Sequence, residues 1–92
     1  MDIDNDEVKT AFSASKKPIA ELFASKTPPR SIYVLELKSA CIEAIAPFNF
    51  RFESSGNEYD ASSVIIPKWK VTIKSTVSKQ GQLVGEPDVV RI

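Results

Sequence analysis

The spacing of apolar residues changes partway along this chain, and that change most constrains its fold. Near the N-terminus apolar and small residues recur every three or four positions, as on one face of an amphipathic helix. From Pro47 onward they recur at every second position, as on one face of a strand. Helical residues followed by strands predict an α+β fold, with an N-terminal helical region packed on a three- or four-stranded antiparallel sheet formed by the C-terminal half. The 92 residues suit one small domain, spanning residues 1–92.

The helical stripe contains Val8, Ala11, Phe12, Ser15, Ile19, Leu22 and Phe23. Asp4, Asn5 and Asp6 can cap its start, because their side-chain oxygens accept hydrogen bonds from free backbone N–H groups. Pro18 lies inside the stripe and removes one backbone donor. We therefore expect two short helices or one kinked helix that breaks near residues 15–17. The sequence Thr27-Pro28-Pro29 is expected to end the helical region.

Residues 31–46 allow two interpretations. A helix would gather Val34, Leu37, Cys41, Ala44 and Ile45 on one arc and end at Pro47, and we favour this interpretation. The segment nevertheless opens with the strand-forming residues Ile32-Tyr33-Val34. The alternative is a strand over residues 31–38, followed by a second strand that enters the phenylalanine run.

The C-terminal half alternates apolar and polar residues. Phe48, Phe50 and Phe52 predict a half-buried strand, and Ser54-Ser55-Gly56-Asn57 has the composition of a turn. A short strand is expected over residues 59–66 and the clearest strand over residues 68–77. Residues 78–81 then predict a hairpin turn, and residues 82–92 a weaker returning strand.

The strand at 68–77 carries the main candidate site. Its pleat would place Trp69 on one face, and Lys68, Lys70, Thr72 and Lys74 on the other. No carboxylate occurs between Asp60 and Glu86. If the Phe48–Phe52 strand pairs in the same sheet, Arg51 joins this basic face. We therefore predict a partner-binding surface of Arg51, Lys68, Lys70, Thr72 and Lys74, although any soluble sheet carries lysines on its solvent face.

Two further groups of charged residues occur in the sequence. A second basic cluster, Lys16, Lys17, Lys26 and Arg30, falls near the end of the helical region. Glu58 and Asp60 form the nearest approach to a catalytic carboxylate pair, but we expect them to be solvated loop residues.

Recognised catalytic and metal-binding patterns are absent from the sequence. It contains no histidine, and its three glycines lack the spacing of a phosphate-binding loop. A single cysteine, Cys41, excludes an internal disulfide, and its apolar neighbours predict that it is buried. We expect a protein without enzymatic activity, cofactor, metal or small-molecule substrate.

The chain has no apolar run of the ~20 residues that a membrane-spanning helix needs. Its start, Met1-Asp2-Ile3-Asp4-Asn5-Asp6-Glu7, is acidic, whereas secretory signal peptides begin with basic residues. We expect no membrane association and a cytoplasmic location in the host cell.

A single-domain, histidine-free, motif-free chain of this size resembles the small inhibitory proteins encoded by phages and mobile elements. Among these it is most similar to the anti-CRISPR proteins that bind multi-subunit type I surveillance complexes. The resemblance implies a protein that blocks target nucleic acid at the complex or wedges between its subunits. Strongly acidic DNA mimics differ from this chain, whose formal net charge is zero, so a steric or RNA-contacting mode fits better.

The expected partner is a larger protein or ribonucleoprotein complex, with contacts to phosphates as one option. Two alternatives stay open. The first is a nucleic-acid-binding accessory domain that uses the basic strand face. Against it, single-strand binders place aromatic rings beside their cations, whereas Trp69 and the phenylalanines are predicted to face the core. The second is a small structural or virion subunit.

Overall fold

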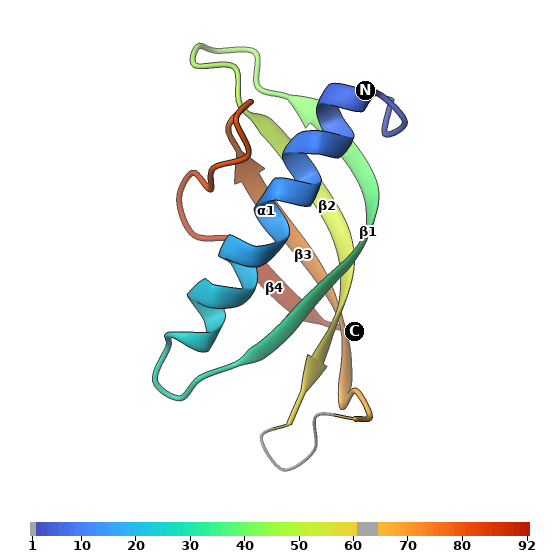
Figure 1. Ribbon diagram of the computed structural model, residues 1–92, viewed down its shortest axis with the longest axis vertical. Helices are drawn as coiled ribbons and strands as arrows, with labels where there is room; N and C mark the ends of the chain where they lie inside the picture. Colours follow the sequence, from blue (N-terminus) through green and yellow to red (C-terminus); the bar gives the residue numbers. More distant parts are fainter. Residues whose placement is uncertain (1, 61–64) are drawn as a thin grey trace.

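The computed structural model describes residues 2–60 and 65–92, which form one helix and one sheet. Helix α1 (Asp6–Ala24) precedes strands β1 (Ser31–Ile42), β2 (Phe50–Tyr59), β3 (Trp69–Val77) and β4 (Asp88–Arg91). The four strands pair antiparallel in chain order, and α1 crosses one face of the curved sheet (Figure 1). The predicted α+β fold, with an N-terminal helix on an antiparallel sheet, is confirmed.

Helix α1 begins and continues for identifiable reasons. Asn5 is the N-cap, and its side-chain oxygen accepts hydrogen bonds from the backbone N–H of Glu7 at 2.9 Å and of Val8 at 3.3 Å. The helix then runs through Pro18 without a second start, so the expected break near residues 15–17 is absent. Apolar residues are buried on both sides of Pro18, and we attribute the continuity to this packing, which outweighs one lost backbone hydrogen bond.

The favoured helix over residues 31–46 is wrong, because residues 31–42 form strand β1. The register shifts between Val34 and Leu37 and again between Leu37 and Ser39, which are β-bulges. Val34, Leu37 and Ala40 all pair with inward-facing residues of β2, so the residues that face the core lie three apart. The bulges therefore gave a strand the apolar spacing of a helix. The alternative interpretation, a strand over residues 31–38, was correct about the type of structure, but the strand extends to Ile42.

Strand β2 is longer than the sequence indicated. Phe50 and Phe52 are buried as predicted, but Phe48 precedes the strand and is 49% exposed. Residues 54–57 continue the strand, so the predicted turn is wrong. Gly56 is needed there because a Cβ atom would lie 2.6 Å from the Tyr33 carbonyl oxygen and 2.8 Å from Ile73 Cδ1.

The prediction for β3 is confirmed, and the turn after it is closed by a hydrogen bond from the Gly81 N–H to the Ser78 carbonyl, 2.9 Å. The returning segment forms one bridge, between Val77 and Leu83, before the short strand β4. Of the expected strand at 59–66, only the first residue belongs to a named strand, β2, and residues 61–64 lie outside the described residues.

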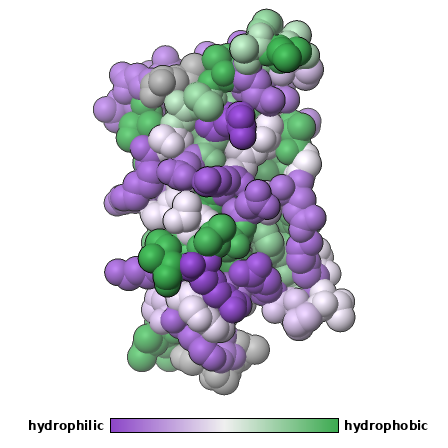
Figure 2. All heavy atoms as spheres, turned by 180° about the vertical axis from the view of Figure 1, so that it is seen from behind, coloured by the Kyte–Doolittle hydropathy of each residue, from purple (hydrophilic) through white to green (hydrophobic). Residues whose placement is uncertain are grey.

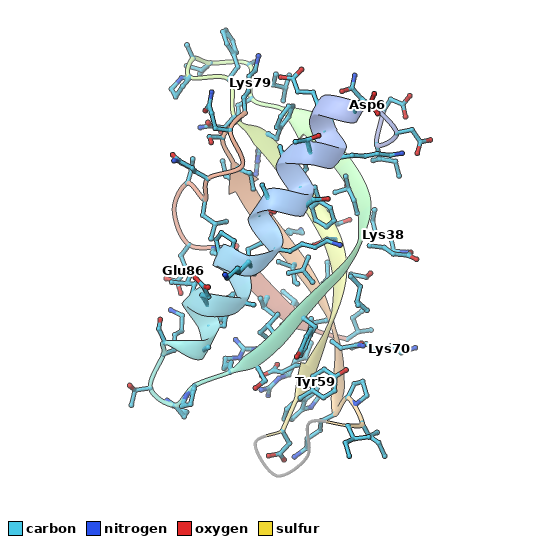
Figure 3. The ribbon with its side chains drawn as sticks, in the orientation of Figure 1. Asp6, Lys38, Tyr59, Lys70, Lys79 and Glu86 are labelled. Carbon is cyan, nitrogen blue, oxygen red and sulfur yellow. The ribbon has the colours of Figure 1, made fainter. Side chains whose placement is uncertain are left out.

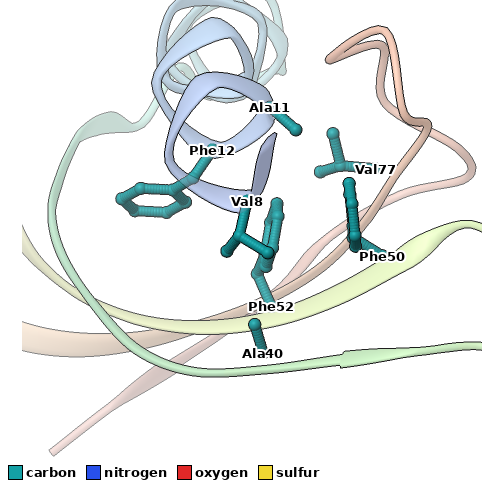
Figure 4. Packing of buried hydrophobic residues seen from close by; sticks show 7 residues of the cluster. All are labelled: Val8, Ala11, Phe12, Ala40, Phe50, Phe52 and Val77. Carbon is teal, nitrogen blue, oxygen red and sulfur yellow. The ribbon is translucent and has the colours of Figure 1, made fainter. Parts of the chain in front are cut away.

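The core between α1 and the sheet has two apolar clusters. The first joins the start of α1 to β1, β2 and β3 (Figure 4): Val8, Ala11, Phe12, Ala40, Phe50, Phe52 and Val77. The second joins the end of α1 to β1 and β3: Ile19, Phe23, Ile32, Val71 and Ile73. Buried serines separate the two clusters on α1, at Ser15, and on β3, at Ser75, and the buried Ser54 on β2 pairs with Ile73 of the second cluster. The helix thus covers one face of the sheet and leaves the other uncovered.

Candidate functional site

The face of the sheet opposite α1, here called the outer face, carries rows of side chains that run across neighbouring strands. Strand registers place Tyr33, Asn57 and Lys70 in one row, and Ile92 follows because its N–H bonds to the Lys70 carbonyl, 2.9 Å. The other rows are Ser55–Thr72–Val90, then Ser39–Glu53–Lys74–Asp88, then Cys41–Arg51–Thr76. Figure 2 shows this side of the molecule as mainly hydrophilic, with a smaller group of apolar side chains.

Four of the five predicted site residues share the outer face. Arg51, Lys70, Thr72 and Lys74 all point away from the core, in agreement with the alternating burial of β2 and β3. Lys68 precedes β3. Its ammonium lies 3.0 Å from an Asp60 carboxylate oxygen and 4.7 Å from the Trp69 ring centroid.

The positive charge of this face is smaller than the sequence suggested. Lys74 lies between two carboxylates on neighbouring strands: Glu53 at 3.9 Å on β2, and Asp88, its register partner on β4. Arg51 and Lys70 differ from it, since neither forms an ion pair with any described residue. The two cations that remain available to a partner are therefore Arg51 and Lys70.

The second basic cluster of the sequence is dispersed into separate contacts. Lys17 lies 3.8 Å from Glu21 on the same helix, and Lys26 pairs with Glu86. Lys16 lies over the Phe12 ring, 5.3 Å from its centroid. Arg30 belongs to the ionic cluster described below, so these cations do not form one surface.

Sequence reasoning missed two tyrosines on the outer face. Tyr33 and Tyr59 contact each other edge to face, with ring centroids 5.2 Å apart. Tyr33 is 61% exposed. Cys41 also lies on this face and is exposed, so its predicted burial is wrong. Cys41 pairs with the outward-facing Arg51, and the two bulges of β1 cancel, so Tyr33 and Cys41 lie on the same face.

Glu58 lies on the opposite, inner face and is 2% exposed, so the prediction of a solvated loop carboxylate is wrong for this residue. Two arginines each bind it through two hydrogen bonds. Arg30, in the connection before β1, donates at 2.8 and 3.0 Å, and Arg91 of β4 donates at 3.0 and 3.1 Å. The Arg91 guanidinium also lies over Trp69, 3.7 Å from the ring centroid. We call Arg30, Glu58, Arg91 and Trp69 the ionic cluster.

The ionic cluster keeps its carboxylate ionised. Hydrogen bonds from Arg30, and then from Arg91, lower the pKa of Glu58 from 4.5 to about 2, against the opposing effect of burial. The same bonds raise the pKa of Arg30 and Arg91 above the ordinary value. A carboxylate with so low a pKa is a poor general acid or base near neutral pH, which favours a structural role for Glu58.

The two edges of the sheet are poorly suited to pairing with another strand. Edge strand β1 is interrupted by its bulges and carries Glu36 and Lys38 next to them, whose side chains pair at 3.2 Å. Edge strand β4 contains only four residues. Bulged, charged or short edges are features that prevent edge-to-edge association. The outer face is therefore a better candidate for partner binding than either edge of the sheet.

The outer face also contains shallow grooves. One of about 400 Å³ lies among Cys41, Arg51, Glu53, Lys74 and Asp88. Another, of about 530 Å³, is lined in part by Leu35, Asn57, Lys70 and Ile92. Their mixture of apolar, amide and charged groups suits contact with a macromolecule better than transformation of a small substrate.

Within residues 2–60 and 65–92, no group of three or more histidine, cysteine, aspartate or glutamate residues is placed to hold a metal ion. The same residues contain no helix with the length and apolar character required to cross a membrane. No family model, curated protein or solved structure gave a match to this chain.

Proposed function

We propose that this protein is a non-enzymatic inhibitor that binds a larger partner through the outer face of its sheet. The observation that carries the proposal is the uncovered outer face itself, on which Arg51, Lys70, Thr72 and Lys74 are presented together by β2 and β3. A rigid sheet with a packed helix behind it can hold such groups in fixed positions, which lowers the entropy cost of binding.

The chemistry of the face fits an acidic surface on the partner. Arg51 and Lys70 lie at opposite ends of the paired region of β2 and β3, and neither is neutralised by a described residue. Thr72 and Ser55 between them can donate and accept hydrogen bonds. Unpaired cations at the two ends of a polar strip favour electrostatic steering and a defined orientation.

The partner class follows from the resemblance to anti-CRISPR proteins. Within this proposal, the protein acts in the cytoplasm of a host cell and binds a type I CRISPR surveillance complex, so that the complex no longer engages its target nucleic acid. Contacts to the phosphates of the bound guide RNA are compatible with the cations of the outer face. The mode of inhibition is steric, because the chain has no net negative charge with which to mimic DNA.

The test uses a purified type I surveillance complex and a labelled target DNA. The protein is expected to bind the complex in a titration and to prevent target binding. Arg51→Glu combined with Lys70→Glu should weaken that binding at least tenfold, because two cations are replaced by two anions. Lys9→Glu combined with Lys17→Glu is the matched control, because both lysines are exposed on α1, which covers the opposite face of the sheet.

Folding of each variant is checked by its thermal unfolding temperature, since exposed strand positions usually change stability by less than about 0.5 kcal/mol. An unaltered affinity of the double variant would refute the assignment of the outer face. Failure of the wild-type protein to bind any type I complex would refute the proposed partner.

A further inference from the structure

We propose that one end of the outer face binds single-stranded nucleic acid directly. This site, here called the tyrosine patch, consists of Tyr33, Asn57, Tyr59 and Lys70. It does not depend on the proposed partner complex, because the free protein already presents all four residues.

The aromatic part of the patch is available for stacking. Tyr33 is 61% exposed and contacts Tyr59 edge to face, with ring centroids 5.2 Å apart, so the ring is held by a neighbour while most of its surface is open to solvent. Bases of a single strand stack on such rings whatever their sequence, because every base has a π face. Duplex DNA hides those faces, so the proposal is specific for single strands.

A cation lies at the distance that a stacked nucleotide requires. Tyr33, Asn57 and Lys70 are aligned across β1, β2 and β3, so the tyrosine and the lysine are two strand spacings, about 10 Å, apart. Figure 3 shows Tyr59 and Lys70 at the same end of the sheet. A base on Tyr33 would therefore bring a neighbouring phosphate within reach of the long Lys70 side chain, which forms no ion pair among the described residues.

The polar groups between ring and cation fit the edge of a base. The Asn57 side chain lies between them and offers both a donor and an acceptor. Beside it lies the shallow groove of about 530 Å³, whose lining includes Leu35, Glu36, Asn57, Lys70 and Ile92.

The charged residues nearest to the patch are those that line the groove beside it. They are two cations, Lys16 and Lys70, and one carboxylate, Glu36. Lys70 forms no ion pair among the described residues, so its charge is available to a phosphate. The sequence predicted that aromatic rings and cations face opposite ways, but Tyr33 and Tyr59 share the outer face with Lys70.

The experiment measures fluorescence anisotropy of labelled oligothymidylate of about twelve nucleotides, a length within the usual range of such sites. Free protein is titrated at several salt concentrations. Saturable binding that weakens as salt rises is expected, together with weaker binding to a duplex of equal length. Tyr33→Ala should weaken binding about tenfold, whereas Tyr33→Phe, which keeps the ring, should stay within about twofold of the wild type.

Lys70→Glu should also weaken binding and reduce its dependence on salt. Lys79→Glu serves as the distant control, because Lys79 lies at the far end of the molecule from Tyr59 and Lys70 (Figure 3). No binding of the wild type at about 50 mM salt would overturn the proposal, because phosphate contacts are strongest at low ionic strength. Equal binding by wild type and Tyr33→Ala would overturn the stacking role. Loss of surveillance-complex binding in Tyr33→Ala, without any oligonucleotide binding by the wild type, would assign the patch to protein contact instead.

Discussion

Replacing Glu58 by glutamine tests whether the ionic cluster stabilises the fold. The substitution keeps the shape of the side chain but removes the charge that Arg30 and Arg91 share. A tenfold change in acid dissociation constant corresponds to about 1.4 kcal/mol. The lowering of the Glu58 pKa from 4.5 to about 2 therefore sets about 3 kcal/mol as the largest contribution of the ionised carboxylate. We expect Glu58→Gln to lower the free energy of unfolding by about 2–3 kcal/mol at pH 7.

The stabilisation of the fold by ionised Glu58 decreases as the pH falls. Its pKa is lower in the folded than in the unfolded protein, so the stabilisation is complete above about pH 4.5 and is lost as the pH falls toward 2. At pH 3 the unfolded carboxyl group is largely protonated while the folded one is still mostly ionised. About 2 kcal/mol of the contribution is therefore lost between pH 7 and pH 3 in the wild type, and none of it in Glu58→Gln.

The assay is urea unfolding followed by the fluorescence of Trp69, the only tryptophan, which lies against Arg91 in the ionic cluster. Glu53→Gln is the matched control on the same strand, because Glu53 is more exposed and its ion pair with Lys74 is long, at 3.9 Å. It should change stability by less than about 1 kcal/mol. The reasoning fails if Glu58→Gln is as stable as the wild type at pH 7, or if both proteins lose equal stability on acidification.

Three further substitutions test the packing, each by urea unfolding. Gly56→Ala should cost at least about 2 kcal/mol, because its Cβ would lie 2.6 Å from the Tyr33 carbonyl oxygen, which is backbone and cannot move aside easily; a cost below 0.5 kcal/mol would contradict this. Ser75→Ala should raise stability by about 1 kcal/mol, since the buried Ser75 hydroxyl has no hydrogen-bond partner among the described residues; a clear loss would imply a partner. Asn5→Ala should cost about 1 kcal/mol by removing the cap of α1, and an unchanged protein would show that this cap is dispensable.

The elements that could be predicted from the sequence are those stabilised by contacts close along the chain. Helix α1 has a regular apolar stripe and a cap one residue before its start, and β3 alternates without interruption. The turn at 78–81 is likewise closed by residues within it and next to it. In each of these three elements, residues close together in the sequence are enough to predict the local structure.

Strand β1 could not be predicted, because its spacing is set by residues that lie opposite it. The bulges exist only relative to the register with β2, and they place Val34, Leu37 and Ala40 on one face at helical spacing. Glu58 was misplaced for a related reason. Its two arginine partners are 28 and 33 residues away in the chain, so nothing near it in the sequence distinguishes it from an exposed acid.

The charge of the outer face could not be predicted from the residues of β3 alone. The stretch around β3 contains lysines and no acids, yet each side chain of a sheet is surrounded mainly by residues of the neighbouring strands. The register places Glu53 and Asp88 on either side of Lys74, and it leaves Lys70 beside Asn57 and Ile92 instead. Two lysines that look equivalent in sequence therefore differ in charge environment. It follows that charge reversal at Lys70 tests recognition, whereas reversal at Lys74 first disturbs interactions within the protein.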